Sequence, residues 1–411
     1  MLVFLSIRQF LRDMRSQKLR TFLTMFGIMW GTISVVLLMA FGTGVQEYEV
    51  KQFKGLGENI AIIWSGLTSK PWNGLPRGRR IRFTEEDITN IKANVPGIVR
   101  ISPEFKSYGV MLRSNRNNMR AQVAGVWPEF CDMRNLIPDS GGRFLNDNDM
   151  REKRRVIFIG DELASKLFPG ENPIGNILQV NGVPFIVVGV LKPKMQDSSY
   201  GGRDTRAAFI PSTTFYSMSS RRYPDNGVVQ AANQDETQSV IDGIYRYMAA
   251  KYNFDPEDTE TLMVWDTTEG FKFFNAFFMA LRLFLVGIGC MTLITGGIGV
   301  SNIMNVVLEE RTKEIGIKMA LGAKKGTIMS QFLFETMLLT FVGGTIGFGL
   351  AMVIVKVYPM LNLTDELGVP TIHFMESLAA VAILGIIAFL AGFFPARRAA
   401  NLQPVTALKL F

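Results

Sequence analysis

The stretch TFLTMFGIMWGTISVVLLMAFGTGVQ, residues 21–46, decides the fold because it carries no charged side chain. A helix needs about 20 mostly apolar residues to cross roughly 30 Å of hydrocarbon. A charge at mid-bilayer costs roughly 2.5–3.5 kcal/mol, so such a run indicates a membrane span. The run is too long for a signal-peptide core and is expected to stay as an uncleaved anchor. Three later runs are similarly long and apolar: Leu283–Leu308, Met329–Val355 and Ser377–Pro395.

Basic residues in the short flanking segments predict the orientation. They precede the first run, separate the second from the third, and follow the fourth: Arg8, Arg12, Arg15, Lys18, Arg20; Arg311, Lys313, Lys318, Lys324, Lys325; Arg397, Arg398, Lys409. Both termini are therefore expected in the cytoplasm, with residues from about 47 to 280 outside. This topology accounts for most of the net charge of +8, so the basic composition does not indicate nucleic-acid binding.

The region between the first two runs is predicted to be a mixed α/β domain. Asn181-Gly182 between two alternating apolar runs predicts a β-hairpin, and Thr84-Glu85-Glu86-Asp87 predicts a capped helix start. Cys131 has no cysteine partner in this domain, so a disulfide within it is not possible and its hydrophobic core alone must stabilise it. Strands are expected at 58–64, 98–101, 109–113, 119–126, 155–159, 177–180, 185–190, 207–210, 228–232 and 261–265, helices at 84–92, 161–168 and 235–252, and flexible stretches at 67–80 and 195–204.

Helical composition continues beyond the first two spans. Glu47–Lys54 and Thr267–Phe278 are predicted to extend them outward as a paired stalk that could carry motion. Near the N-terminus, apolar residues alternate with arginines at helical spacing, which is typical of an interfacial helix; a solvated helix packing on a partner is the alternative. The expected segments are an amphipathic cytoplasmic helix (1–19), span one (20–46), the α/β domain with its stalk (47–280), span two (281–308), a cytoplasmic helix (309–326), span three (327–356), an outer loop (357–376), span four (377–396) and a cytoplasmic tail (397–411).

The chain lacks the motifs of common catalytic sites. It contains no G-x-x-x-x-G-K-[ST] and no G-x-S-x-G sequence. With one histidine and two separated cysteines, a His/Cys metal site is not expected. His373 is predicted to lie at the outer mouth of the fourth span, in an interfacial role. We therefore expect no catalytic residue and no cofactor or metal bound by this chain.

Small residues recur at close spacing inside the apolar runs. Such residues let spanning helices approach closely, so they are predicted to form helix-packing faces: Gly27, Gly31, Gly296, Gly297, Gly299, Gly343 and Gly347. The cluster at 296–299 has no preceding strand, which excludes a dinucleotide fingerprint. Glu335, with Gln331, lies near the start of the third run. This carboxylate is expected to cap a helix contact or to meet a partner, with a role in transport as the alternative.

The segment from Glu309 to Ala323 is too charged to span a membrane and too apolar for a free linker. Ile315, Met319 and Leu321 are expected to face the membrane or a partner groove. On the other side, charges alternate at helical spacing: Arg311, Glu314 and Lys318. A short charged helix between two spans suits docking to a soluble motor.

Several motifs resemble the permeases of the MacB/FtsX superfamily. They cover nearly the whole chain and include residues 18–24, 57–60, 160–169, 173–175, 185–190, 294–304, Glu310-Arg311-Thr312-Lys313-Glu314-Ile315-Gly316, 331–335, Pro395-Ala396-Arg397-Arg398-Ala399-Ala400 and 403–408. The resemblance implies a MacB-like outer domain with a strand-helix part and an inserted part at about 130–200.

The resemblance also implies partners and a mode of action. Such permeases form dimers in the bacterial inner membrane, each copy bound to an ATPase subunit that holds ATP and Mg²⁺. Many work with a membrane-fusion adaptor and an outer-membrane channel, and relay motion through the stalk (mechanotransmission). Residues 309–326 would be the coupling helix, with these predicted ATPase contacts: Glu310, Arg311, Lys313, Glu314 and Lys318. MacB-type proteins often carry a fused ATPase; only about 20 residues precede the first span here, so a separate ATPase chain is expected.

Three functions remain open at this point. The favoured one is efflux of a periplasmic substrate through a tripartite pump. The second is extraction of lipoproteins or lipids from the inner membrane, which would need an apolar groove at the base of the outer domain. The third is FtsX-like regulation of cell-wall hydrolases, against which the large outer domain argues. The substrate is not predictable from the sequence.

Overall fold

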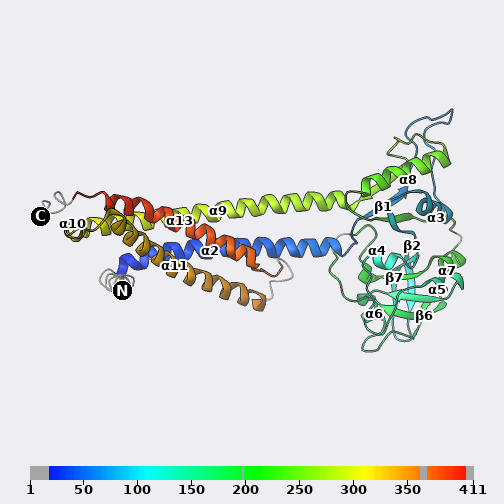
Figure 1. Ribbon diagram of the computed structural model, residues 1–411. Coiled ribbons are helices and arrows are strands. Elements are labelled where there is room, and N and C mark those ends of the chain that lie inside the picture. The colour runs from blue at the N-terminus through cyan, green and yellow to red at the C-terminus, as the bar shows by residue number, and fades with distance from the viewer. Residues whose placement is uncertain (1–17, 197–198, 220, 362–367, 404–411) are drawn as a thin grey trace. The chain divides into compact units, whose positions relative to one another are not determined.

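The computed structural model describes residues 18–196, 199–219, 221–361 and 368–403 (Figure 1). The chain forms two compact units, each described here by itself. The membrane unit comprises residues 1–48 and 276–411, and the α/β domain comprises residues 49–275. The predicted N-terminal amphipathic helix, the centre of the outer loop and the end of the tail lie outside the described residues.

Four long helices match the four predicted spans: α2 (Lys18–Lys54), α9 (Thr267–Glu310), α11 (Lys325–Val357) and α13 (Phe374–Ala400). Each is long and apolar enough to cross a membrane, and only 17–35% of each apolar stretch is buried inside the protein. Their remaining apolar surface therefore suits a lipid environment. The prediction of four membrane helices with an α/β domain between the first and second is confirmed. The residues predicted to form the stalk are helical, as parts of α2 and α9.

The fourth membrane span was predicted to end at about Pro395, and the helix that contains it is longer. Pro395 lies inside α13, which continues to Ala400. Proline removes one backbone donor, a loss that packing against other membrane helices can offset. Ala396 and Ala399 are fully buried in a cluster with Met304 and Phe332, so packing holds the last turns of α13 in place.

Two short elements complete the membrane unit. The helix α10 (Thr312–Ala320) follows α9 after a single non-helical residue, Arg311, and the 3₁₀ turn η2 (Tyr358–Leu361) follows α11. The predicted cytoplasmic helix at 309–326 is therefore divided among the end of α9, the shorter α10 and the start of α11.

The described residues of the α/β domain form a nine-stranded sheet in the order β3-β7-β4-β6-β5-β2-β8-β1-β9. The strands are β1 (Ile60–Ser65), β2 (Ile98–Arg113), β3 (Asn118–Val126), β4 (Val156–Ile159), β5 (Ile177–Val180), β6 (Val183–Val190), β7 (Ala207–Pro211), β8 (Asn226–Ala231) and β9 (Leu262–Asp266). Most neighbours are antiparallel, whereas β3 pairs with β7, and β4 with β6, in parallel.

The sheet divides into two parts that share β2. In one part, α3 (Glu85–Asn94) and α8 (Thr237–Tyr252) enclose an apolar cluster with β1, β8 and β9 (Figure 1). The other part carries the short helices α4 (Phe130–Met133), α5 (Asp147–Arg151), α6 (Asp161–Leu167) and α7 (Ser212–Met218) and the turn η1 (Asp204–Arg206). It is larger than the predicted insertion at 130–200, because β3 and β7 also belong to it.

Two local predictions are confirmed in atomic detail. Asn181 and Gly182 have φ of 47° and 85°, as a type I′ turn requires, and join the antiparallel strands β5 and β6. Thr84 caps α3: its hydroxyl accepts from the Asp87 amide, and the Asp87 carboxylate accepts from the Thr84 amide.

Other local predictions were wrong. The strands expected at 98–101 and 109–113 form one continuous strand, β2, because a bulge between Ser107 and Val110 absorbs Gly109 in a left-handed conformation (φ 67°). The helices α4, α5 and α7 were not expected, because their four to seven residues are too short for a periodic signal.

Candidate functional site

The predicted coupling segment has an inner and an outer face. On the inner face, Ile315 and Gly316 are buried, and Ile315 packs with Leu308, Ile328 and Phe332 of α9 and α11. Met319 packs against the same cluster. The expectation that Ile315 and Met319 face a partner or the membrane was therefore wrong, because both side chains fix α10 to its neighbouring helices.

Arg311 also faces inward. Its guanidinium contacts the carboxylate of Glu335 in α11 at 3.2 Å, and Gln331 donates to the same carboxylate at 3.2 Å. The side chains of Arg311 and Glu335 are only 15% and 7% exposed. The pair thus ties the junction of α9 and α10 to α11, which fits the expectation that Glu335 caps a helix contact. The structure places the Arg311 side chain inside the membrane unit rather than on the exposed face of the segment.

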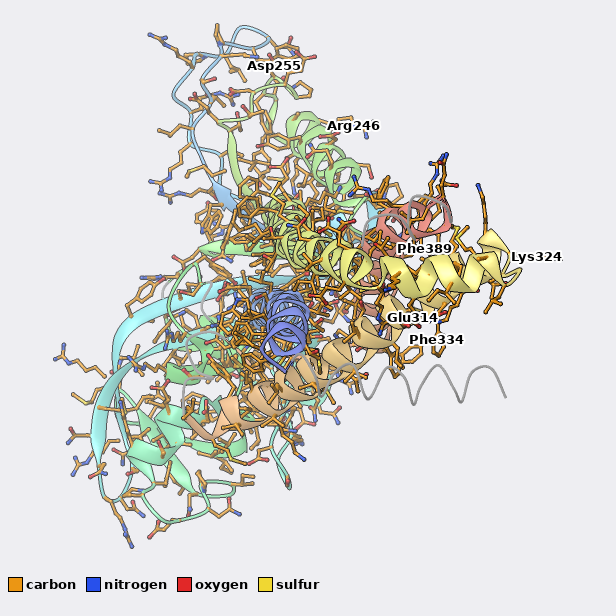
Figure 2. All side chains as sticks on the ribbon, turned by 90° about the vertical axis from the view of Figure 1, so that its left-hand side faces the viewer. Arg246, Asp255, Glu314, Lys324, Phe334 and Phe389 are labelled. Atoms are coloured by element: carbon orange, nitrogen blue, oxygen red, sulfur yellow. The ribbon has the colours of Figure 1, made fainter. Side chains whose placement is uncertain are left out.

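The outer face carries the other predicted coupling residues. Glu310 and Lys313 are exposed, and Glu314 and Lys318 form an i, i+4 ion pair at 2.8 Å. Figure 2 looks at the end of the unit that carries α10 and labels Glu314 and Lys324.

Two apolar side chains complete the outer face. Ile317 is 45% exposed and Leu321 is 83% exposed. Of these two residues, only Leu321 was expected to face the membrane or a partner. Leu321 directly follows α10 and is four positions from Ile317, so the two side chains lie on the same side of the helix. The same spacing in the sequence could have identified Ile317.

The predicted packing glycines lie at helix crossings, with one exception. Gly27 of α2 and Gly296 of α9 meet, because a Cβ on Gly296 would lie 3.0 Å from the Gly27 carbonyl oxygen. Gly343 and Gly347 approach α2 similarly, Gly31 approaches Leu293, and Gly297 approaches Ile387 of α13. A Cβ on Gly299 would meet no atom within 4 Å.

Gly299 instead lines an open groove between α2 and α9. The groove has a volume of about 480 Å³ and an apolar lining: Leu23, Gly27, Trp30, Ile288, Met291, Thr292, Thr295, Gly296, Gly299 and Ile303. Its small residues leave room for a further helix to approach.

His373 precedes α13 as its N-terminal cap residue. Its Nε2 lies 2.9 Å from a carboxylate oxygen of Glu47 in α2, and both side chains are about half exposed. This contact joins two helix ends within the membrane unit, which is compatible with the predicted interfacial role.

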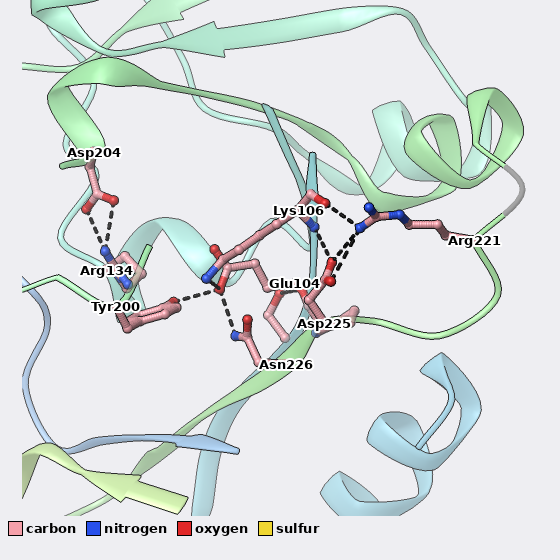
Figure 3. Close-up of polar contacts among 10 residues, drawn as sticks. Glu104, Lys106, Arg134, Tyr200, Asp204, Arg221, Asp225 and Asn226 are labelled. Carbon is pink, nitrogen blue, oxygen red and sulfur yellow. Dashed lines mark hydrogen bonds and ion pairs between the residues drawn. The ribbon is translucent and has the colours of Figure 1, made fainter. Parts of the chain in front are cut away.

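The α/β domain holds a buried ionic cluster that the sequence analysis missed (Figure 3). In its first half, one carboxylate oxygen of Glu104 accepts hydrogen bonds from Tyr200 and Asn226, both at 2.7 Å, and pairs with Lys106 at 3.2 Å. The Lys106 ammonium lies 3.9 Å from the centre of the Tyr200 ring. Burial lowers the pKa of Lys106 and raises the pKa of Tyr200.

In the second half, Asp204 accepts two hydrogen bonds from Arg134, at 2.8 and 3.0 Å, and one from Lys194 at 2.8 Å. Burial raises the pKa of Asp204, but the attraction of the two cations outweighs burial and leaves this pKa lowered. Lys194 also donates to the carbonyl oxygen of Gly55 at 2.9 Å. Because Gly55 directly follows α2, the cluster fastens the chain at the end of this helix to the segment that was expected to be flexible.

A cavity of about 330 Å³ lies where α2 ends and α9 begins. Within the α/β domain, it is lined by the apolar side chains of Leu56, Trp265, Phe271 and Phe274, beside polar groups that include Lys54 and Gln234. Across the described ranges, no group of three His, Cys, Asp or Glu side chains is arranged as a metal site.

Comparisons with known proteins identify the family to which the chain belongs. Residues 21–247 match the family of the MacB-like periplasmic core domain, and residues 286–404 match the FtsX-like permease C-terminal family. The chain therefore belongs to the MacB-like permease family.

Individual relatives agree with this class. The chain is 30% identical over 408 residues to the macrolide export ATP-binding/permease protein MacB of Bdellovibrio bacteriovorus, covering 98% of this chain and 61% of the relative. It is 31% identical over 405 residues to MacB of Rhodospirillum rubrum, covering 97% and 59%. The chain thus spans about three-fifths of the length of these relatives. The crystal structure of the periplasmic region of MacB from Actinobacillus actinomycetemcomitans is similar with a TM-score of 0.43 and 17% identity, covering 55% of this chain and 97% of that one.

Proposed function

We propose that this chain is the permease subunit of a MacB-like ABC transporter, in which a separate ATPase subunit drives conformational change of the α/β domain. The observation that carries the proposal is the continuity of α9. This helix has 44 residues without a break, begins directly after β9 and ends at the residue before Arg311. At 1.5 Å per residue it is about 66 Å long, roughly twice the hydrocarbon thickness of a bilayer. One helix therefore links the coupling segment to the sheet.

The outer face of α10 is the proposed docking surface for the ATPase. Ile317 and Leu321 would enter an apolar groove of the partner, and Lys313 and the Glu314–Lys318 pair would surround them. An exposed apolar centre with a charged rim is typical of protein interfaces. The buried contact between Arg311 and Glu335 would pass a displacement of α10 to α11 as well as to α9.

Dimerisation and orientation also belong to the proposal. A second copy would fill the groove between α2 and α9, since its small residues permit close helix approach. The distribution of basic residues supports cytoplasmic termini and an inner-membrane location. We further propose that the complex works with a membrane-fusion adaptor and an outer-membrane channel, and exports a substrate taken from the periplasm.

The docking surface can be tested with the tagged full chain, purified in mild detergent with its ATP-binding subunit. Leu321→Glu should reduce recovery of this subunit at least tenfold, because it places a charge in the apolar centre. The matched control is Leu361→Glu, at an exposed leucine in η2. Recovery and ATP hydrolysis equal to those of the parent protein would refute the proposed docking surface.

The ion pair of α10 gives a second test. Exchanging the charges in Glu314→Lys/Lys318→Glu keeps a pair within the helix but reverses the charges offered to a partner. We expect ATP hydrolysis to become uncoupled from export while the permease stays folded. Unchanged complex formation and activity would contradict a role of these two residues in coupling.

One observation favours a second candidate function, extraction of lipids or lipoproteins. The cavity lined by Leu56, Trp265, Phe271 and Phe274 is the kind of apolar site that this function requires. If acyl chains occupy it, Phe271→Gln should reduce photo-crosslinking of an acyl probe to the full chain, whereas Phe273→Gln, at an exposed neighbouring residue, should not. Equal crosslinking in both variants would leave efflux as the function.

A further inference from the structure

A second concave surface of the α/β domain has a different chemistry. We name it the arginine groove; it has a volume of about 850 Å³ and is lined by Trp64, Ser65, Arg80, Arg82, Arg221, Arg222, Tyr223, Pro224, Asp225 and Met263. Four arginines thus face one acidic side chain. Because like charges repel, such a concentration is unfavourable unless a negative ligand offsets it.

Two of the arginines are held in place by the protein. Arg82 lies between the buried residues Ile81 and Phe83, and its guanidinium lies 5.4 Å from the centre of the Tyr223 ring. Arg221 donates to the Lys106 carbonyl oxygen at 2.6 Å and pairs with Asp225 at 3.2 Å (Figure 3). Side chains fixed in this way lose little conformational entropy when they bind a ligand.

The other two arginines have no anionic partner in the part of the chain that the structure describes. Among the described residues, neither Arg80 nor Arg222 forms a side-chain hydrogen bond or an ion pair, and both are exposed. The backbone of Arg80 is nevertheless fixed by a β-bridge to Leu67. The neighbouring chain is anchored by Asp258, which accepts hydrogen bonds from Ser69. The open guanidinium group of Arg80 therefore stands on a segment whose backbone is anchored, and that of Arg222 follows directly after Arg221, whose side chain is held by the Lys106 carbonyl oxygen.

The remaining lining is apolar and aromatic. Trp64 of β1 and Met263 of β9 are directly paired in the sheet, and Met263 is 60% exposed. The Trp64 ring contacts Tyr200 edge-on, so the buried ionic cluster supports this wall of the groove. Guanidinium forks match sulfonate, phosphate and carboxylate groups, while an aromatic wall suits a flat apolar body.

We infer that the arginine groove binds a small organic polyanion, a molecule with two or more acidic groups on an apolar or aromatic body. The volume is that of a small-molecule site, which favours such a ligand over a protein segment. This inference does not rest on ATPase coupling, since it concerns only the α/β domain.

The test uses the full chain in nanodiscs of neutral phosphatidylcholine, with pyrene-1,3,6,8-tetrasulfonate as the fluorescent probe. Binding is measured by anisotropy at constant ionic strength. Arg80→Gln/Arg222→Gln should weaken binding about 100-fold, since each lost charge-assisted contact is worth about tenfold. The matched control is Arg113→Gln/Arg120→Gln, at two exposed arginines of β2 and β3. Melting curves establish that both variants are folded.

A further variant tests the apolar wall. Met263→Gln should weaken binding of the tetrasulfonate severalfold and leave the weaker binding of inorganic sulfate unchanged. Absence of probe binding at millimolar concentration, or equal weakening in the control variant, would overturn the inference. Tighter binding of hexaglutamate than of the tetrasulfonate would overturn it in favour of an acidic protein segment.

Discussion

The substitution Asp204→Asn tests whether the buried ionic cluster holds the α/β domain together. The Asp204 side chain is 6% exposed, and its carboxylate forms ion pairs with both Arg134 and Lys194, which are 3% and 9% exposed. The amide of asparagine can accept at most part of their hydrogen bonds and removes the negative charge. Two buried cations would then both lose the carboxylate that pairs with them.

The expected loss follows from this burial. Removing one partner of a buried ion pair costs about 3–5 kcal/mol of unfolding free energy. For a domain of this size, each kcal/mol shifts the melting temperature by roughly 2–4 °C. The unfolding transition of the α/β domain should therefore fall by about 6–20 °C.

The assay is thermal unfolding of the full chain in detergent, followed by tryptophan fluorescence. The matched control is Asp235→Asn, whose partner Lys272 lies on the surface; such pairs contribute about 0–1 kcal/mol. A second variant, Asp204→Asn/Lys194→Met, removes one unpaired cation and should recover part of the loss. If Asp204→Asn is no more destabilising than Asp235→Asn, the cluster does not carry the stability that we assign to it.

Three further predictions concern other contacts. In Glu335→Gln, Arg311 loses its buried counter-charge, so the melting temperature of the detergent-solubilised chain should fall by several degrees. In Gly347→Ala, the added Cβ would lie 2.6 Å from the Met29 carbonyl oxygen, and overpacking should cost about 1–3 kcal/mol in the same melting assay; Gly349→Ala, where a Cβ would meet no atom within 4 Å, should be neutral. Burial raises the pKa of Asp87, but hydrogen bonds from Lys251, Tyr252 and Thr84 outweigh it and lower this pKa. The resulting stability is present above pH about 4 and is lost as pH falls through the lowered pKa. The difference in melting temperature between wild type and Asp87→Asn, measured from pH 7 to pH 3, should therefore shrink as the pH falls. A difference that stays constant would contradict this.

Local signals in the sequence predicted much of the fold. The uncharged runs predicted the membrane helices because hydrocarbon excludes charge along about 20 residues. Asn181-Gly182 predicted its hairpin because few residue pairs adopt positive φ at both positions. In contrast, the extent of β2 depended on a bulge at Gly109, and the continuation of α13 past Pro395 depended on packing against other helices.

The candidate sites were harder to predict because they depend on contacts between distant residues. Tyr200 and Glu104 are 96 positions apart, and Tyr200 lies in a Ser/Gly/Asp-rich stretch that is typical of a mobile loop. Charge alternation drew attention to residues 309–323, but it did not distinguish the inward Arg311 from the outward Lys313. That distinction depended on Glu335, which comes from another helix.

In the proposed function, ATP binding to the partner subunit moves the α/β domain. Spin labels at Arg246→Cys on α8, in a Cys131→Ser/Cys290→Ser background, allow distances between two copies to be measured by double electron–electron resonance. With the complete complex in nanodiscs, we expect different distance distributions with ADP and with ATP under conditions that block hydrolysis. Identical distributions in an ATPase-active complex would contradict it.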